Sequence, residues 1–416
     1  MSASGRVLVL GGGPAGMMAA ITAGRLGADV VLLEKNAAPG QKLLLTGNGR
    51  CNLSNQADLE TLIAKTPGNG RFLYSAFSRF NPDALRSFFR DLDLETKIEE
   101  GGRIFPGTDS SRDVLAALLH GLEKAGVTVA AGNAVTELFC ENGQITGVRT
   151  SAGVCSASAV IIATGGMSYP ATGSTGDGYG LAGSVGHQII APRPALVPLT
   201  SPAVWIRGLQ GLSLKQIRAD LTATATRLMS RRGELIFTHY GVSGPLILDL
   251  SRTAVTSMRS GAAVVLHLDL TPDLGHDALD KQILAVLAAR PNGMCKNALG
   301  DLLPARLAEA IIGLAGLRPE TSANRISREE RGRIAAFIKD LAIPLSGARP
   351  LAEAIVTAGG VAVTEVSPRT MASRLIRGLY LAGEVLDIDG ETGGFNLQAA
   401  FSSGRLAGES AALGQE

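Results

Sequence analysis

The stretch RVLVLGGGPAG, residues 6–16, decides the fold class of this 416-residue chain. Residues 6–10 form a short apolar run that predicts a buried β-strand. Residues 14–27 are rich in alanine, methionine and leucine and predict a helix, and residues 29–33 predict a second strand. A strand, a glycine turn, a helix and a second strand in this order are typical of a Rossmann-type nucleotide-binding unit.

The glycine turn has the spacing GxGxxG at Gly11, Gly13 and Gly16. In such a unit the first glycine makes the tight turn, the second lets the backbone approach a pyrophosphate, and the third lets the helix pack on the strand. Pro14 and Ala15 open the helix, whose N-terminal amides and positive dipole end favour a phosphate. The turn therefore predicts a dinucleotide site.

Glu34 ends the second predicted strand, 18 residues after Gly16. A carboxylate at this place accepts hydrogen bonds from the adenosine ribose and repels a 2′-phosphate, so it argues against an NADP-type site here. Lys35, the next residue, belongs to the same predicted site. A glycine-rich turn in another kind of α/β protein remains the alternative, because GxGxxG alone is a weak signal.

Distant segments favour FAD over NAD as the nucleotide. VIIATGG at 160–166 is a strand that runs into a glycine turn at Thr164 and Gly165. LYLAGE at 379–384 is a second strand that runs into a glycine turn, and it ends in Gly383 and Glu384. A long cofactor held at one end by the first glycine turn can meet the Glu384 carboxylate through its ribityl hydroxyls.

A third segment, GGFNLQ at 393–398, opens an alanine-rich helix over residues 399–408. Its N-terminal amides are suited to stabilise negative charge on a reduced flavin. The alternative is an ordinary sheet edge followed by a glycine-capped helix.

The remaining motifs resemble those of the BaiN/RdsA (YhiN-like) flavoproteins, in order along nearly the whole chain. They are QKLLLTGNGRCNLSN (41–55), GRIFP (102–106), ATGG (163–166), SYP (168–170), GSTGDG (173–178), FTHYGVSGP (237–245), TAGGV (357–361), GEVLD (383–387) and GGFNLQ (393–398). One departure is Asn48, where glycine is common in that family, which puts the conformation of its loop in doubt.

The resemblance implies an α/β fold: a glutathione-reductase-like FAD-binding Rossmann domain with an inserted β-barrel-like domain and a small helical subdomain. The expected ranges are 1–195 and 349–416 for the FAD domain, 196–275 for the inserted β domain and 276–348 for its helical part. By resemblance, the FAD-contacting positions are Ala15, Glu34, Gln41, Lys42, Gly47, Val135, Glu384 and Leu397, and Asn396 is included with its neighbour.

Members of that family resemble flavin reductases driven by NADH or NADPH. No second GxGxxG is present, so NAD(P)H is expected to reach the flavin without a Rossmann domain of its own. The favoured reaction is reduction of a uridine of 23S ribosomal RNA to dihydrouridine. The alternatives are an FAD enzyme acting on a free small molecule, such as a steroid enone or an amine, and a non-catalytic FAD-containing RNA-binding factor.

Reduction of an activated C=C needs a proton donor as well as a hydride. Cys51 is a candidate because a neighbouring Arg50 guanidinium would lower the pKa of its thiol. Histidine as a residue type has an unperturbed pKa suited to proton transfer near pH 7, so His239 is the next candidate, and Arg103 is suited to clamp an anionic substrate. The respective alternatives are a buried structural cysteine, a structural histidine and a loop salt bridge.

Composition excludes several classes of protein. With 45% hydrophobic and 18% charged residues, the chain has enough apolar residues for a core and is not predominantly disordered. Four cysteines without a CxxC pair argue against a metal site, and no apolar run reaches the roughly 20 residues of a membrane span. We expect no metal, no membrane partner and a cytoplasmic location. The net charge of +2 leaves an RNA partner open, and two arginine clusters in the insert suit either an RNA backbone or a solvated surface.

Overall fold

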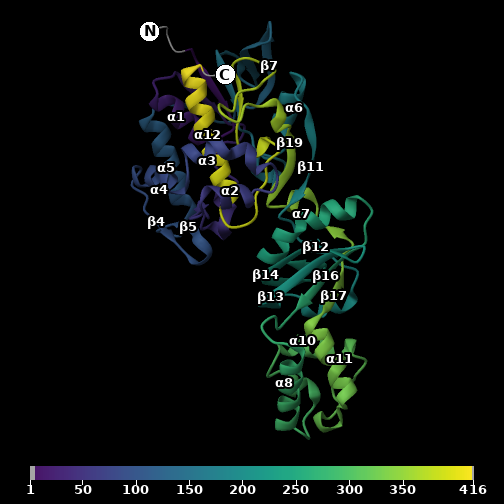
Figure 1. Cartoon of the computed structure of the whole chain (residues 1–416). Helices are drawn as coiled ribbons and strands as arrows, with labels where there is room; N and C mark the ends of the chain where they lie inside the picture. The colour runs from purple at the N-terminus through teal and green to yellow at the C-terminus, as the bar shows by residue number, and fades with distance from the viewer. Residues whose placement is uncertain (1–4, 415–416) are drawn as a thin grey trace. The chain divides into compact units, whose positions relative to one another are not determined.

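The chain divides into two compact units in the computed structural model, which describes residues 5–414 (Figure 1). The first unit combines the ranges Met1–Ala195 and Leu351–Glu416, and the second is Leu196–Pro350. The first unit is therefore built from both ends of the chain, and the second is an insertion between them.

A five-stranded parallel sheet forms the centre of the first unit, in the order β20-β10-β1-β2-β6. Its strands are β1 (Val7–Leu10), β2 (Val30–Leu33), β6 (Thr128–Ala130), β10 (Ala159–Ile162) and β20 (Leu379–Leu381). Strands β1 and β10 are buried at every residue, which explains their uninterrupted apolar sequences. Because β20 comes from the C-terminal segment, it brings Gly383 to the same sheet edge as the glycine turn after β1.

Two helices from opposite ends of the chain pack closely in this unit. They are α1 (Pro14–Arg25) and α12 (Phe395–Leu413), which lie side by side in Figure 1. A Cβ added at Gly404 or Gly408 would lie 2.2 Å from the backbone oxygen of Ala15 or Ala19, respectively. Only glycine allows the helices to approach so closely, and this contact places the middle of α12 against the first turn of α1, directly after the glycine turn.

Further elements complete the first unit. The helices are α2 (Leu59–Ala64), α3 (Tyr74–Arg79), α4 (Pro82–Arg90), α5 (Ser111–Lys124) and α6 (Asp177–Ser184). Three small antiparallel sheets contain β3 (Ser54–Asn55), β4 (Thr96–Ile98) and β5 (Arg103–Pro106); β7 (Val135–Glu141), β8 (Gln144–Thr150) and β9 (Gly153–Ser156); and β11 (Ile189–Ala195) with β19 (Val356–Val361).

The second unit contains a seven-stranded sheet in the order β17-β16-β13-β14-β15-β12-β18, in which every pairing is antiparallel. Its strands are β12 (Leu199–Thr200), β13 (Ser213–Ala223), β14 (Thr226–Thr238), β15 (Gly241–Ser243), β16 (Val264–Asp269), β17 (Leu341–Pro344) and β18 (Gly347–Ala348). The edge strands β17 and β18 are joined by residues 345–346 alone, which span at most about 11 Å. A flat sheet would hold its edges about 29 Å apart. The sheet therefore curls until its edges approach, which gives the barrel-like form.

The helices of the second unit are α7 (Pro245–Arg259), α8 (His276–Ala289), α9 (Cys295–Leu299), α10 (Ala305–Leu314) and α11 (Arg328–Lys339). Helix α11 begins at a capping box in which Ser327 and Glu330 satisfy each other's backbone amides. One expectation needs correction: the range 276–348 is not helical to its end, because β17 and β18 return to the sheet. Their alternating and glycine-containing sequences are too short to signal strands without the partner strands.

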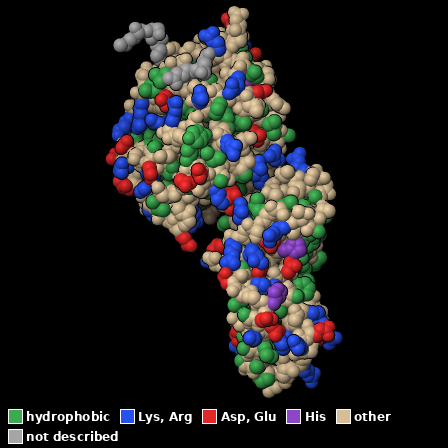
Figure 2. Space-filling model, in the orientation of Figure 1, with side chains coloured by type: hydrophobic (Ala, Val, Ile, Leu, Met, Phe, Trp, Pro, Cys, Tyr) green, Lys and Arg blue, Asp and Glu red, His purple; other side chains and the backbone are tan. Residues whose placement is uncertain are grey.

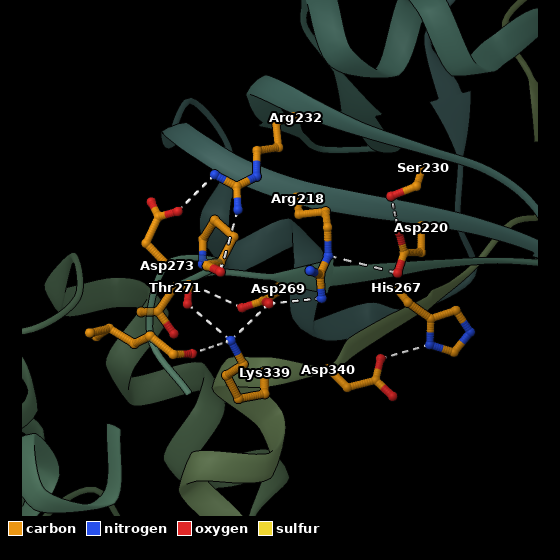
Figure 3. A network of polar contacts seen from close by, with 12 residues as sticks. Arg218, Asp220, Ser230, Arg232, His267, Asp269, Thr271, Asp273, Lys339 and Asp340 are labelled. Atoms are coloured by element: carbon orange, nitrogen blue, oxygen red, sulfur yellow. Dashed lines mark hydrogen bonds and ion pairs between the residues drawn. The ribbon is translucent and has the colours of Figure 1, made fainter. Parts of the chain in front are cut away.

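A buried carboxylate joins the end of α11 to this sheet (Figure 3). Asp269 at the end of β16 is 3% exposed, and its Oδ2 lies 3.0 Å from Nη2 of Arg218 and 2.8 Å from Nζ of Lys339. Lys339 also donates to the backbone oxygens of Thr271 and Leu274. These ion pairs place two cations beside the buried Asp269 carboxylate, so the network is a structural connection between the helices and the sheet.

Candidate functional site

The glycine turn after β1 has the geometry of a phosphate cradle. Gly11 has φ +101°, and a Cβ there would lie 2.6 Å from the Ala163 oxygen. A Cβ on Gly16 would lie 1.9 Å from the Gly11 oxygen, whereas one on Gly13 would meet nothing within 4 Å. Gly13 is the N-cap of α1 and provides no side-chain cap, so open space adjoins the helix N-terminus that starts at Pro14 and Ala15. This arrangement fits a pyrophosphate group.

Glu34 lies against this turn. Its carboxylate is 7% exposed, and it accepts hydrogen bonds of 2.7 Å from the backbone amides of Gly12 and Asn36. A carboxylate offers about four acceptor positions, so two stay available for ribose hydroxyls. The neighbouring Lys35 points to a different partner, since its Nζ lies 2.6 Å from Oδ2 of Asp177. Lys35 therefore fixes the start of α6.

The glycine turn after β10 carries two predicted site residues. Gly165 has φ +74°, in the region that favours glycine. The Oγ1 atom of Thr164 is buried and has no hydrogen-bond partner within residues 5–414. A Cβ on Gly178 would lie 2.1 Å from this Oγ1, so α6 packs directly against the turn.

Glu384 is the centre of a polar cluster that connects three segments. Its Oε2 lies 2.8 Å from Nζ of Lys42, and its Oε1 accepts from the backbone amide of Thr357 at 2.7 Å and from Oγ of Ser168 at 3.2 Å. Lys42 also donates to Ser168 Oγ at 2.7 Å. Both charged side chains are about one-fifth exposed, 22% for Lys42 and 21% for Glu384, so the pair is open to a bound ligand.

The turn at Gly383 touches the first glycine turn. A Cβ on Gly383, which has φ +75°, would lie 2.7 Å from the Cβ of Ala15. The amide of Gly383 donates to Oγ of Ser403 on α12 at 3.0 Å. The two turns that were predicted to hold opposite parts of one nucleotide are thus direct neighbours.

The remaining predicted cofactor residues surround these turns. Gln41 donates to the Ala38 oxygen at 3.2 Å, and Gly47 adopts φ +57°. Asn396 at the start of α12 bonds the backbone of Gly390, and Leu397 beside it is half-buried. Val135 begins β7 and is half-buried, close after Asn133, whose amide bonds the Glu34 oxygen. The two hydrogen bonds between the Asn396 side chain and the Gly390 backbone stabilise the turn that precedes α12.

The expectation that Arg50 lowers the pKa of the Cys51 thiol is wrong. The Arg50 guanidinium instead bonds Glu99 and Asp109 at 2.5 Å each, and it lies 4.1 Å from the centre of the Phe105 ring. Cys51 is 0% exposed, and burial raises the pKa of its thiol to about 12. Sequence adjacency placed the two residues together, but their side chains have different surroundings.

Arg103 and His239 lie in different units. Arg103 at the start of β5 is exposed and donates to the Glu100 oxygen at 3.1 Å, a contact within its own loop. His239 is exposed in the turn between β14 and β15, in the second unit. Cys51 and Arg103 belong to the first unit.

Sequence reasoning did not single out the residues that position this site. Ser168 and Thr357 stand inside family motifs that do not indicate their contact with Glu384, and the motifs do not include Gly404 and Gly408. A glycine pair four residues apart on the final helix was the available signal, since that spacing lets two helix backbones approach.

These observations fit an FAD molecule. The open helix N-terminus at Gly13 suits the pyrophosphate, and the buried acceptor Glu34 suits the adenosine ribose. Lys42 and Glu384 are suited to hold the polar chain that leads to the ring. Bound FAD supplies hydride chemistry, which no side chain can provide.

A known protein family matches nearly the whole chain. The family model described as "HI0933-like protein Rossmann domain" matches residues 5–410. The chain belongs to this family. Within the HI0933-like family, the chain is 32% identical over 417 residues to 3-dehydro-bile acid delta(4,6)-reductase of Clostridium scindens. The aligned region covers 98% of this chain and 99% of the relative. It is 30% identical over 397 residues to ribosomal RNA dihydrouridine synthase of Escherichia coli, with 95% of each chain covered.

Solved structures share the fold of this HI0933-like chain. The 3-ketosteroid delta1-dehydrogenase of Sterolibacterium denitrificans superposes with a TM-score of 0.55 and 14% identity, over 99% of this chain and 100% of the other. The predicted family, the Rossmann-type α/β fold and the assignment as an FAD-dependent oxidoreductase are confirmed. Among residues 5–414, no helix combines the length and apolar character that crossing a membrane requires.

Proposed function

We propose that this enzyme uses FAD to saturate a C=C conjugated with a carbonyl, and that its substrate is a uridine of ribosomal RNA. The observation that carries the FAD-dependent part is the contact between the Gly383 turn and Ala15, which unites the two halves of one nucleotide cradle. Uridine and a steroid dienone share a C=C conjugated with a carbonyl, so the names of the two relatives support one type of reaction.

The charge distribution favours RNA over a free small molecule. The second unit carries 19 Lys and Arg against 13 Asp and Glu, whereas the first unit carries 20 against 24. The net charge of the whole chain is close to zero only because the acidic first unit offsets the basic insert. An excess of positive charge on the insert attracts nucleic acid. On the face in Figure 2 the basic side chains are interspersed with acidic ones, which suits moderate, salt-sensitive binding.

A free small molecule is the second candidate substrate. The bile-acid reductase is matched over 98% of this chain at 32% identity, which supports a steroid enone as fully as sequence similarity supports RNA. Against it stands the arginine-rich character of the insert, which an apolar steroid does not need.

Two further roles complete the proposal. NADH or NADPH is the hydride source, entering without a Rossmann domain of its own. His239 is the proposed proton donor, because its imidazole is exposed, whereas the Cys51 thiol is buried. Arg103, exposed on its loop, stays a candidate for substrate anchoring.

The test uses the FAD-loaded protein. The flavin absorbance is followed while NADH or NADPH is added, and then during addition of unmodified ribosomal RNA or a steroid dienone. We expect bleaching by a nicotinamide cofactor, recovery with RNA, and dihydrouridine in the digested RNA by mass spectrometry. Recovery with the dienone alone would replace the first substrate by the second. No bleaching by either cofactor would contradict the proposed donor.

A matched control is the Gly13→Glu variant. A side chain fits at Gly13 because no atom lies within 4 Å of a Cβ there, but its carboxylate would repel the pyrophosphate. This variant is expected to fold, to lack flavin and to leave the RNA unmodified.

A further inference from the structure

A hollow of about 550 Å³ lies entirely within the second unit. Its lining combines the guanidinium groups of Arg207 and Arg349, the rings of His239 and Tyr240 and the Ser201 residue, with Ala203 and Ile206 as the apolar members. Within the described range 5–414, no Asp or Glu lines it. A hollow of this size falls in the range of small-molecule and cofactor sites, about 300–1,000 Å³.

The aromatic wall of the hollow is a tight turn. His239 and Tyr240 are the two residues between the ends of β14 and β15, which pair at Thr238 and Gly241. The Tyr240 oxygen also accepts from the Ser201 amide at 3.0 Å, so β12 holds the turn from its other side. The rings of His239 and Tyr240 meet edge to face with centres 4.9 Å apart. The backbone therefore presents both rings in a fixed arrangement.

A second part of the lining is a short 3-10 helix, residues Val204–Leu209, which carries Arg207. Its Trp205 ring packs on Phe237 of β14 with centres 6.3 Å apart, and Ile206 is 1% exposed. Arg306 of α10 donates to the backbone oxygens of Gly208 and Gln210 at 3.4 and 3.0 Å. Arg207 thus projects from a segment that is anchored by neighbours on both sides.

Two polar side chains in this hollow lack partners. The structure of residues 5–414 gives neither the Arg207 guanidinium nor the His239 imidazole a hydrogen bond or ion pair. The guanidinium carbon of Arg349 lies 4.7 Å from the centre of the Tyr240 ring, a stacked arrangement. A guanidinium with open donors beside aromatic rings matches the two parts of a nucleotide, because guanidinium binds phosphate and aromatic rings stack on bases.

We propose that this hollow binds a phosphorylated nucleotide, with the phosphate at Arg207 and the base against His239 and Tyr240. A metal cation is disfavoured by the cationic lining, and a steroid by the open guanidinium donors of Arg207, for which an apolar ring system offers no acceptors. Two nucleotides share this chemistry in the proposed function, a residue of the RNA strand and the NAD(P)H donor. The identity of the nucleotide rests on that function, whereas the existence of the site does not.

The experiment measures binding to the FAD-loaded protein by isothermal titration calorimetry, with a short oligouridylate and NADPH as separate probes. Arg207→Ala and His239→Ala are compared with Arg318→Ala, which removes another exposed arginine that has no side-chain partner within residues 5–414 and does not line the hollow. We expect one of the two probes to bind at least about tenfold more weakly to both hollow variants and to retain its affinity for the control. The probe that responds identifies the nucleotide.

The outcomes separate this site from the reaction. Equal affinity of the wild-type protein and both hollow variants for each probe would overturn the proposal, as would the absence of saturable binding of either probe. Loss of oligouridylate affinity in protein that fails to reduce ribosomal RNA would support the hollow and refute the RNA reaction. The retained flavin spectrum and melting temperature of each variant verify that it is folded.

Discussion

Gly404 of α12 faces the backbone oxygen of Ala15 so closely that a Cβ would lie 2.2 Å from it. Ala15 follows the glycine turn of the first strand, and Gly404 lies 10 residues from the end of the described chain. This contact fixes the end of the molecule against its beginning, and the cofactor cradle depends on it.

The Gly404→Ala variant is expected to lose both stability and flavin. The added methyl group must push α12 away from α1, and overpacking of this kind costs about 1–3 kcal/mol. Differential scanning fluorimetry is expected to show a melting temperature lower by several degrees, together with a lower ratio of flavin to protein absorbance. Gly180→Ala in α6 is the control, since a Cβ there meets nothing within 4 Å. Similar behaviour of the two variants would contradict the close-packing argument.

Gly13 and Gly16 are expected to respond differently to the same substitution. Gly16→Ala places a Cβ 1.9 Å from the Gly11 oxygen and should distort the turn, whereas Gly13→Ala meets no protein atom. The free energy of unfolding of the flavin-free protein should therefore fall only for Gly16→Ala. The FAD dissociation constant, measured by fluorescence titration, should rise for both, because Gly13 is where the pyrophosphate approaches. Unchanged FAD affinity of Gly13→Ala would place the phosphates elsewhere.

Lys42→Met tests the ion pair with Glu384. The substitution removes the cation 2.8 Å from the Glu384 carboxylate and leaves a half-buried charge without its counter-ion. A hydrogen bond to a charged group contributes about 1.5–3 kcal/mol, so FAD affinity should fall about tenfold or more. Lys281→Met, an exposed lysine on α8, is the control for the loss of one positive charge. Equal FAD affinity of the two variants would show that Lys42 does not act on the cofactor.

His187 makes stability depend on pH. Its side chain is 0% exposed, with Nδ1 3.0 Å from Oε2 of Glu365 and Nε2 2.8 Å from Oγ of Ser373. Burial lowers the pKa of His187 below its ordinary value of 6.5, despite the opposing effect of Glu365. The folded state therefore binds this proton less readily than the unfolded state, and stability present above pH 6.5 is lost as the pH falls through the folded pKa.

The measurement is the melting temperature from pH 8 down to pH 5, a range that lies above the titration of the paired carboxylates. We expect the wild-type protein to lose stability below about pH 6.5. His187→Gln should have a lower melting temperature at pH 8 and a flatter profile. A profile of unchanged slope would assign the pH dependence to other groups.

Cys51 is expected to resist alkylation in the folded protein. Its pKa of about 12 and its complete burial keep the thiolate, which is the reactive form, scarce at pH 8. Mass spectrometry after brief treatment with iodoacetamide should find Cys51 unmodified and the half-buried Cys155 modified. In urea both should react. Rapid modification of Cys51 in the folded protein would restore it as a reactive residue.

Local sequence was sufficient to predict the strand, turn and helix around Gly11, which the structure has as Val7–Leu10 and Pro14–Arg25 on either side of the turn. These features depend on residues within a few turns of one another. The long strand β14 was missed because its sequence, with arginines at 227, 231 and 232, has little apolar alternation. Strand β14 is stabilised by its pairing with β13 and β15. The sequence of β14 alone does not indicate that these partner strands exist.

The sequence by itself determined that a nucleotide would bind after the first strand, because glycine spacing and a strand-end carboxylate act over short distances along the chain. Only the tertiary structure decided that Lys42 meets Glu384, 342 residues away, and that Arg50 turns to Asp109 instead of activating Cys51. Burial and charge pairing depend on which distant segments the fold brings together, and those contacts set the surroundings and the pKa of a side chain.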